Sequence, residues 1–151
     1  MPDGSDQRLR VSDVPWSHLV TPQFHDIIWP QIKPFLVAAL ARDELGRYDI
    51  DDLLQEILLG HVRLWVSYDR ERHEFEMAVV TQIVRHPQVS ECKVWAGGGK
   101  NMKSWLGEFT REIEAYARAE GCRYLTGGGR IGWTRAIPGW RQVGIEIAKE
   151  L

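Results

Sequence analysis

The feature that most constrains this chain is a pair of similar glycine-rich units, KVWAGGGKNMKSW from Lys93 and RYLTGGGRIGWTR from Arg123. Each runs from apolar residues into three glycines and a cation, and a helical pattern of about five turns lies between the glycine triplets, at 102–120. Two short strands joined through such a helix are expected to run parallel, with a right-handed crossover. Glycine runs lose much chain entropy on folding, so two of them need a specific reason.

Upstream, the pattern predicts two helices, over 21–42 and about 48–60. In the second helix, Asp49 is placed to be the N-cap and Gly60 to end the helix. The first helix is expected to be kinked or interrupted by its prolines, Pro22, Pro30 and Pro34.

Alternating apolar residues predict a meander of three antiparallel strands, over 62–69, 74–86 and 91–96. After the helix at 102–120, the pattern predicts a strand over 122–126 and a short helix near 131–137. The alternation of Val143, Ile145 and Ile147 predicts a closing strand. The element order is therefore α-α-β-β-β-α-β-α-β, a mixed α/β sheet that is antiparallel first and parallel in the middle.

Composition indicates a single domain. With 151 residues and 44% hydrophobic content, we expect a flexible tail at 1–12 and one domain at 13–151. The polar start and the absence of a long apolar run predict neither a signal peptide nor a membrane span. Only two cysteines, Cys92 and Cys122, indicate a reducing cytoplasm rather than a disulfide framework.

The first glycine triplet, Gly97 to Gly99, is a candidate anion site. In mixed α/β sheets, ligands collect beyond the carboxyl ends of parallel strands, and these glycines lead into a helix N-terminus whose free N–H groups favour an anion. Lys100 and Lys103 add positive charge there. The alternative is that the glycines only let a strand turn sharply into a helix, and for the second triplet this alternative is at least as strong.

Neither of two known phosphate-binding motifs fits these triplets. The Walker pattern fails, because Asn101 follows Lys100 and the upstream glycine is missing. The stretch GGGRIG at 127–132 formally fits the dinucleotide pattern, but about twenty residues remain after it, too few for the rest of a nucleotide-binding sheet. The sequence therefore indicates neither a Walker loop nor a dinucleotide-binding loop.

From about Val62 to Leu151, the chain resembles the GNAT acyltransferase superfamily. ARAEGCRYLTGGG is similar to that family's helix end and following strand, and IPGWRQVGIEIAKEL to its closing segment. The resemblance implies an antiparallel meander followed by two splayed parallel strands with flanking helices. It also implies that WAGGGKNM binds acetyl-coenzyme A, or another acyl-coenzyme A, through Trp95, Ala96, Gly97, Gly98, Gly99, Lys100, Asn101 and Met102.

The chain departs from that family at several positions. The arginine or glutamine that opens the family's pyrophosphate loop is missing, and Arg135 stands where a tyrosine acid is expected, with Trp133 unable to replace it. Glu76 and Glu91 lie on meander strands, where an exposed side chain is the more common outcome. Surface positions are likewise expected for three histidines, His61, His73 and His86. No residue spacing indicates a metal site, and the catalytic residues stay unassigned.

Two functions remain open. The first is an acyl-coenzyme A-dependent N-acyltransferase acting on a small-molecule or protein amine, without the usual tyrosine acid. The second is a non-catalytic GNAT-fold protein, a virion or assembly component acting with other phage structural proteins, because the chain looks most like small GNAT-like proteins of tailed bacteriophages; it would lie in the host cytoplasm or the virion. A nucleic-acid-binding module is a distant third, supported by scattered arginines, Arg123, Arg130, Arg135 and Arg141, against a net charge of −2. No membrane partner is expected.

Overall fold

The computed structural model describes residue 10, residues 19–128 and residues 133–151. The predicted tail at 1–12 lies outside the described residues except for residue 10. Gly129 and Arg130, from the second glycine unit, lie outside them as well.

A four-stranded sheet forms the centre of the fold, in the order β1-β2-β3-β4. The strands are β1 (Arg63–Asp69), β2 (Glu74–Arg85), β3 (Ser90–Gly99) and β4 (Tyr124–Gly127). The first three pair antiparallel, whereas β3 and β4 pair parallel. The helix α3 (Met102–Ala119) makes the crossover between β3 and β4. The predicted mixed α/β sheet and its crossover are therefore confirmed.

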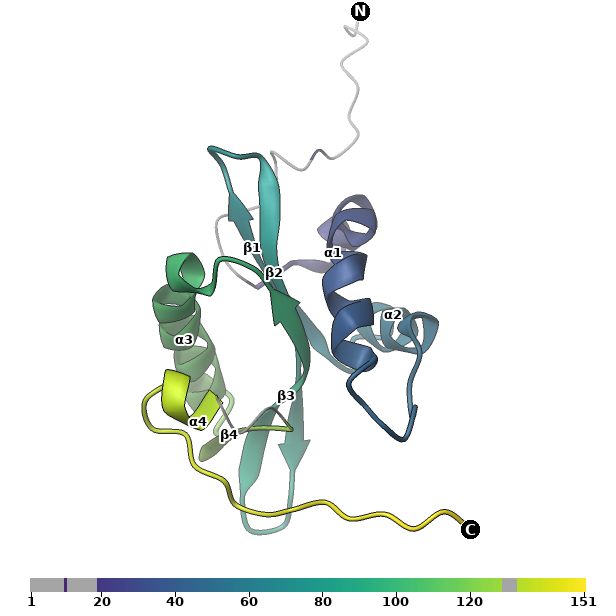
Figure 1. The fold of residues 1–151 in the computed structure, drawn as a ribbon. Helices are drawn as coiled ribbons and strands as arrows, with labels where there is room; N and C mark the ends of the chain where they lie inside the picture. The colour runs from purple at the N-terminus through teal and green to yellow at the C-terminus, as the bar shows by residue number, and fades with distance from the viewer. Residues whose placement is uncertain (1–9, 11–18, 129–132) are drawn as a thin grey trace, which may run out of the picture.

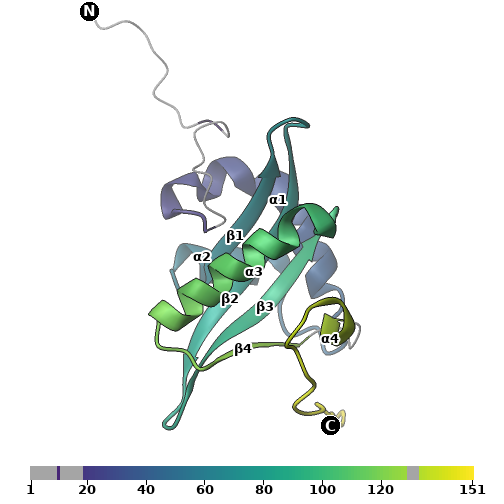
Figure 2. The same ribbon diagram turned by 90° about the vertical axis from the view of Figure 1, so that its left-hand side faces the viewer.

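Helices cover both faces of this sheet, so the fold has three layers (Figure 1). On one face lie α1 (His25–Leu40), preceded by a 3₁₀ turn at Pro22–Phe24, and α2 (Ile50–Leu58); α3 crosses the other face (Figure 2). Successive side chains of a strand point to opposite faces of the sheet, so each face has its own hydrophobic core. Leu64 and Val66 pack toward α1 and α2, while Trp65 packs toward α3.

The prediction that prolines interrupt the first helix is wrong in part. α1 continues through Pro30 and Pro34. Ile28, Ile32 and Leu36 recur every four residues and are fully buried, whereas both prolines are exposed on the outer side. The carbonyl groups that the prolines leave without an intrahelical donor can therefore be hydrated, and burial of the inner stripe holds the helix together.

The second helix follows the prediction closely. Asp49 caps it, its carboxylate accepting from the Asp52 amide at 2.9 Å, while the Asp52 carboxylate accepts from the Asp49 amide at 3.0 Å. This reciprocal capping box satisfies two amides that a helix start would otherwise leave without an acceptor. Gly60 adopts a φ of 77° just past the helix end, the left-handed conformation that glycine favours.

The predicted closing strand is wrong. The short helix α4 (Trp133–Ala136) is present, but residues 141–151 form no regular structure. Val143, Ile145 and Ile147 are 80%, 81% and 89% exposed. The segment runs as an extended chain from α4 toward the side of α1 and α2 (Figure 1). An alternating pattern favours a strand only where a sheet edge lies alongside, and this segment does not lie along its own β4.

The start of α1 carries a buried histidine that makes stability depend on pH. His25 is 7% exposed, and its Nε2 has no hydrogen-bond partner among the described residues. It lines a cavity of about 50 Å³. Burial lowers the pKa of His25, with the Arg63 charge acting in the same direction and Asp26 against it. The unfolded chain therefore takes up a proton more readily than the fold does.

We expect this contribution to be complete above pH 6.5, the ordinary histidine pKa, and to be lost as the pH falls below it. Urea unfolding of the wild type at pH 7.5 and pH 5 should show a drop in the unfolding midpoint. His25→Gln, which stays neutral, should show a smaller drop. Equal drops in both proteins would exclude His25 as the cause.

Candidate functional site

The two parallel strands part at one end of the sheet. β3 and β4 pair only from Glu91 with Tyr124 to Val94 with Gly127. Beyond Val94, β3 continues to Gly99 with β2 as its sole strand partner in the described part of the chain. Among the described residues, the backbone groups on this side of β3 beyond Val94 therefore have no strand partner, in agreement with the splay that the resemblance implies.

A β-bulge lies where the strands part. Val80 pairs with Ala96 and Thr81 with Val94, so Trp95 is the extra residue of β3. Because a bulge shifts the side-chain alternation by one position, Trp95 and Ala96 both pack toward α1 and α2. The bulge bends the β3 backbone next to the point where its pairing with β4 ends.

Two aromatic side chains flank the bulge and the end of β4. Tyr48, from the connection between α1 and α2, makes an edge contact with Trp95, with 4.5 Å between ring centroids. The Trp140 ring lies 3.9 Å from the position that a Cβ on Gly127 would take. The side chain of the bulge residue Trp95 thus has a tyrosine ring beside it, and the tip of β4 has an indole nearby.

The first glycine triplet does not form the loop that the sequence indicated. Gly97, Gly98 and Gly99 lie within β3, paired with Val79, Ala78 and Met77 of β2. The reason for the glycines is space: a Cβ on Gly98 would lie 2.6 Å from the Phe35 carbonyl oxygen, and one on Gly99 would lie 2.5 Å from the Glu76 carbonyl oxygen. These glycines let α1 and β2 approach the β3 backbone.

The connection between β3 and α3 is only Lys100 and Asn101. The Lys100 amide donates to the Glu76 carbonyl at 2.8 Å, and the Trp105 indole donates to the Lys100 carbonyl at 2.8 Å. Asn101 takes the left-handed conformation, with a φ of 53°, which asparagine tolerates better than most residues. The turn into the helix is therefore short and held by its own hydrogen bonds.

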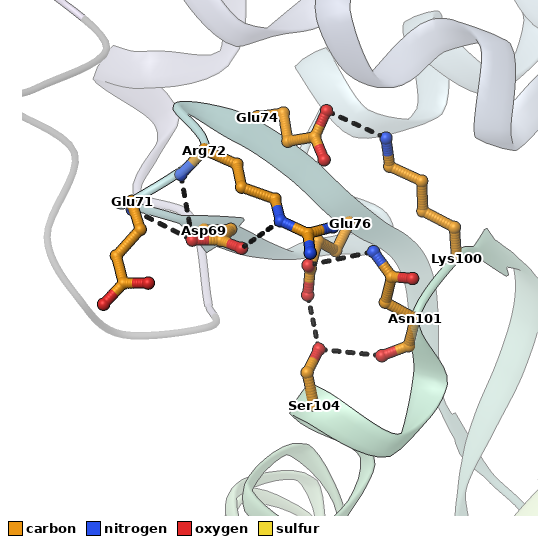
Figure 3. Close-up of polar contacts among 8 residues, drawn as sticks. All are labelled: Asp69, Glu71, Arg72, Glu74, Glu76, Lys100, Asn101 and Ser104. Carbon is orange, nitrogen blue, oxygen red and sulfur yellow. Dashed lines mark hydrogen bonds and ion pairs between the residues drawn. The ribbon is translucent and has the colours of Figure 1, made fainter.

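A buried carboxylate lies at the start of α3 (Figure 3). Glu76 is 5% exposed, against the expectation of an exposed side chain. Its carboxylate accepts from Asn101 Nδ2 at 3.2 Å and from Ser104 Oγ at 2.5 Å. The first-turn amides of Met102 and Lys103 point out of the helix without intrahelical acceptors. Glu76 thus places negative charge close to the helix end where the sequence predicted an anion.

The lysines do not make this end strongly positive. Lys100 Nζ lies 3.0 Å from Glu74 Oε2, so its charge is paired (Figure 3). Lys103 is exposed on the first turn of α3. The two carboxylates, Glu74 and Glu76, equal the two ammonium groups in number. Any attraction for a phosphate at this position must therefore come from the helix amides and Lys103 rather than from a net positive field.

Glu91 lies at the opposite end of the sheet. Its carboxylate accepts from Thr126 Oγ1 at 2.9 Å and contacts His86 Nε2 at 2.9 Å. These partners and Lys93 lower the pKa of Glu91, although burial acts against them and is the largest single influence. Glu91 is the first β3 residue that pairs with β4, so it lies at the paired end of the two strands and not where they part.

The remaining candidate residues lie elsewhere. His61 bonds to Glu56 on the surface, and Cys92 is buried with its pKa raised to about 11 by burial, so its thiol is inert. Arg135 is exposed on α4. Within the described ranges, no cluster of three or more His, Cys, Asp or Glu side chains is placed to hold a metal ion. Nor does any helix there have the length and apolar character needed to cross a bilayer.

Comparison with known proteins supports the fold directly. No protein-family model matches the chain, and no curated protein matches it. Among solved structures, it is similar to a GNAT family acetyltransferase of Staphylococcus aureus (TM-score 0.60, 12% identity, covering 89% of this chain and 97% of that one). An acetyltransferase of Trypanosoma brucei gives a TM-score of 0.57 at 8% identity, covering 88% and 96%. The glucosamine-6-phosphate N-acetyltransferase of Arabidopsis thaliana gives 0.55 at 10%, covering 68% and 76%.

This chain has the GNAT fold. At sequence identities of 8–12%, the similarity shows the fold alone. The chemistry of the site therefore depends on this chain's own residues.

Within this GNAT fold, the structure brings Trp95 and Ala96 to the parting of the strands, and places Lys100, Asn101 and Met102 at the start of α3. The sequence reasoning missed Tyr48, because a tyrosine in a connection nearly fifty residues upstream carries no motif. It also missed the burial of Glu76. A second bulge, in β2 where Tyr68 pairs with Phe75 and Ser67 with Met77, makes Glu76 the extra residue. The sequence does not mark this bulge, because Phe75 and Met77 stand two apart as in a regular strand, although they pack on opposite faces of the sheet.

Proposed function

We propose that this chain binds an acyl-coenzyme A between β3 and the end of β4, and transfers the acyl group to an amine. The observation that carries the proposal is the parting of the two parallel strands beyond Val94 and Gly127, beside the bulge at Trp95. An exposed strand edge offers backbone N–H and C=O groups, and a pantetheine arm, with its two amides, can pair with them as an added strand does.

The chain's own groups suit acyl transfer at that position. A bound acyl-coenzyme A supplies an activated acyl group. Backbone N–H groups at the Trp95 bulge can polarise the carbonyl that the amine attacks, and water can accept the proton of the amine. Tyr48 contacts the Trp95 ring from the connection between α1 and α2, so its phenol is the candidate proton donor to the leaving sulfur, in place of the tyrosine missing at Arg135.

Glu76 is not proposed as the general base. Its partners lie at Asn101 and Ser104, and Asn101 is six residues past the bulge, about 20 Å away along an extended strand. From that position, its carboxylate would lie near the diphosphate of the ligand rather than near the thioester. It would weaken, not assist, binding at the α3 amides.

The same carboxylate favours a second candidate, a non-catalytic GNAT-fold protein. A two-residue connection closed by its own hydrogen bonds, with Glu76 beside it, leaves little room for a diphosphate at the helix start. Under this proposal the fold serves as a scaffold, and a virion or assembly role with other phage proteins is the form that the sequence resemblance suggests.

Calorimetric titration with acetyl-coenzyme A separates these two proposals. For the acyltransferase we expect a dissociation constant of about 1–100 μM, weakened about tenfold or more by Lys103→Glu. Lys33→Glu, the same charge reversal on the exposed face of α1 in the opposite layer, should leave the affinity unchanged. Glu76→Gln should tighten binding, because it removes the carboxylate that competes with the diphosphate.

Tyr48→Phe tests the chemistry separately. In an assay of coenzyme A release with a panel of amines, it should slow turnover while leaving the affinity for acetyl-coenzyme A within about twofold. If neither the folded wild type nor Glu76→Gln binds acetyl-coenzyme A in the calorimeter, the acyltransferase proposal is wrong. The non-catalytic scaffold would then be the remaining proposal.

A further inference from the structure

We propose that His25 makes the start of α1 a pH-sensitive switch: when its imidazole takes up a proton, residues 20–25 detach from β1 while the rest of the fold stays folded. Such a local opening differs from a general loss of stability in acid, because it is confined to one corner of the molecule. It does not require coenzyme A to bind.

The buried ring of His25, the first residue of α1, has a partner on one side only. The imidazole hydrogen-bonds to the Val20 backbone, whereas Nε2 has no partner among the described residues. A neutral ring tolerates this environment, because the unpaired Nε2 then carries only a lone pair. A protonated ring would instead bury a charged N–H group without an acceptor, which is far more costly.

The charges around His25 do not compensate a proton on its ring. Among the described residues that line its cavity, the only other ionisable one is Arg63 of β1, and α2 contributes none. Burial is the main reason that the pKa of His25 is lowered, and the Arg63 charge acts in the same direction. Asp26 acts against them, but its side chain is exposed, so water screens the attraction. The positive end of the α1 dipole also lies at His25, so protonation is unfavourable while the ring stays in place.

Residues 20–25 can open separately from the rest of α1. They are tied to β1 through Val20, whose amide donates to the Leu64 carbonyl at 2.9 Å. The later turns of α1 are instead fixed by its fully buried stripe from Ile28 to Leu36. Helix ends open at a lower free energy than helix interiors. Because opening also exposes Val20 and Phe24, it stays rare as long as His25 is neutral.

The opening would expose an apolar surface. Behind residues 20–25, the cavity is lined by side chains that include the buried Val62 and Leu64. At the end of α2, Leu58 lines the same cavity, and both Leu58 and Leu59 are 59% exposed. In acid, the newly exposed and the already exposed side chains would join into one apolar patch, of the kind that binds hydrophobic molecules.

Hydrogen exchange of the full chain, followed by NMR and corrected for intrinsic exchange rates, tests the proposal. From pH 7.5 to pH 5, we expect the opening constant at the Val20 amide to rise by up to about thirtyfold, because a histidine with the ordinary pKa of 6.5 gains a proton on opening. This exchange should respond weakly to about 1 M urea, whereas exchange in the middle of β2 should respond strongly, since only the latter requires global unfolding.

Two variants assign the switch to one histidine. His25→Gln stays neutral, so its Val20 exchange should change by less than about threefold over the same pH range. His61→Gln is the matched control, because His61 is exposed and pairs with Glu56 on the surface, and it should keep the wild-type rise. At pH 5, the dye anilinonaphthalene sulfonate should fluoresce more strongly with the wild type than with His25→Gln.

Three results would each overturn the proposal. The first is a Val20 amide whose exchange has the same urea dependence as the middle of β2, which would mean that the opening is global. The second is an equal rise in acid for the wild type and His25→Gln. The third is equal dye fluorescence with these two proteins at pH 5. The first result needs no variant, so the test holds even if His25→Gln fails to fold.

Discussion

Gly98→Ala is expected to lower the free energy of unfolding by about 3 kcal/mol, a large loss for a single methyl group. The new Cβ would lie 2.6 Å from the Phe35 carbonyl oxygen and 3.3 Å from its carbonyl carbon. Both atoms belong to the α1 backbone, which cannot rotate away as a side chain does. Either α1 or β3 must therefore shift, and with it the contacts of the fully buried Ile32 and Leu36. Urea unfolding followed by circular dichroism measures the change.

Gly107→Ala is the matched control for this prediction. Gly107 lies exposed in α3, and the nearest atom to its added Cβ is the end of the Arg111 side chain at 3.9 Å. Since alanine favours the helix over glycine by about 1 kcal/mol, this variant should be slightly more stable. If Gly98→Ala unfolds at the wild-type urea concentration, α1 does not pack on β3 as closely as described.

The close contact of Gly98 with Phe35 makes Gly98 a poor position for testing the cofactor site. A charged residue at Gly98 would abolish ligand binding simply by displacing α1, whether or not a diphosphate lies nearby. Lys103, exposed on the first turn of α3, has no such packing constraint, so a change there reports on the ligand. In the structure, Gly98 and Gly99 allow α1 and β2 to pack closely on β3.

Trp65→Ala is expected to cost about 3–5 kcal/mol. Trp65 is 2% exposed and joins the sheet to α3, with edge contacts to Phe109 and Tyr116 at centroid distances of 5.9 and 5.2 Å. Its Nε1 donates to Thr81 Oγ1 at 2.9 Å, and Thr81 is 1% exposed. Truncation would leave both a cavity and a buried hydroxyl without its donor. Thermal and urea unfolding should agree on the loss.

A double-mutant cycle separates the cavity from the hydrogen bond. Trp65→Phe keeps an aromatic ring but removes the donor, whereas Thr81→Val removes the acceptor and leaves a buried N–H group unsatisfied; each should cost about 1–3 kcal/mol. In the double variant neither polar group remains, so the loss should be smaller than the sum by about 1 kcal/mol. Strict additivity would mean that Thr81 and Trp65 do not share this bond.

Most of the secondary structure followed from patterns that are local in the sequence. The stripe of α3, the alternation of β1 and β2, and the Asp49 cap each depend on residues a few positions apart, so they could be predicted without the fold. The parallel pairing of β3 and β4 also followed, because a five-turn helix between two strands leaves few other connections. The GNAT resemblance rested on that order of elements, and the solved structures support the fold.

The meaning of particular residues was decided by the tertiary structure. Whether Gly98 serves a ligand or a neighbouring helix depends on Phe35, more than sixty residues away, and no local pattern contains that distance. The burial of Glu76 beside Asn101, and the contact of Tyr48 with Trp95, arise in the same way. The alternation of Val143, Ile145 and Ile147 describes a segment that favours strand pairing, but a strand also needs an edge. By itself, the sequence determined which segments can form helices and strands; only the tertiary structure decided which of their side chains meet and which edges remain open, because those contacts join residues far apart in the chain.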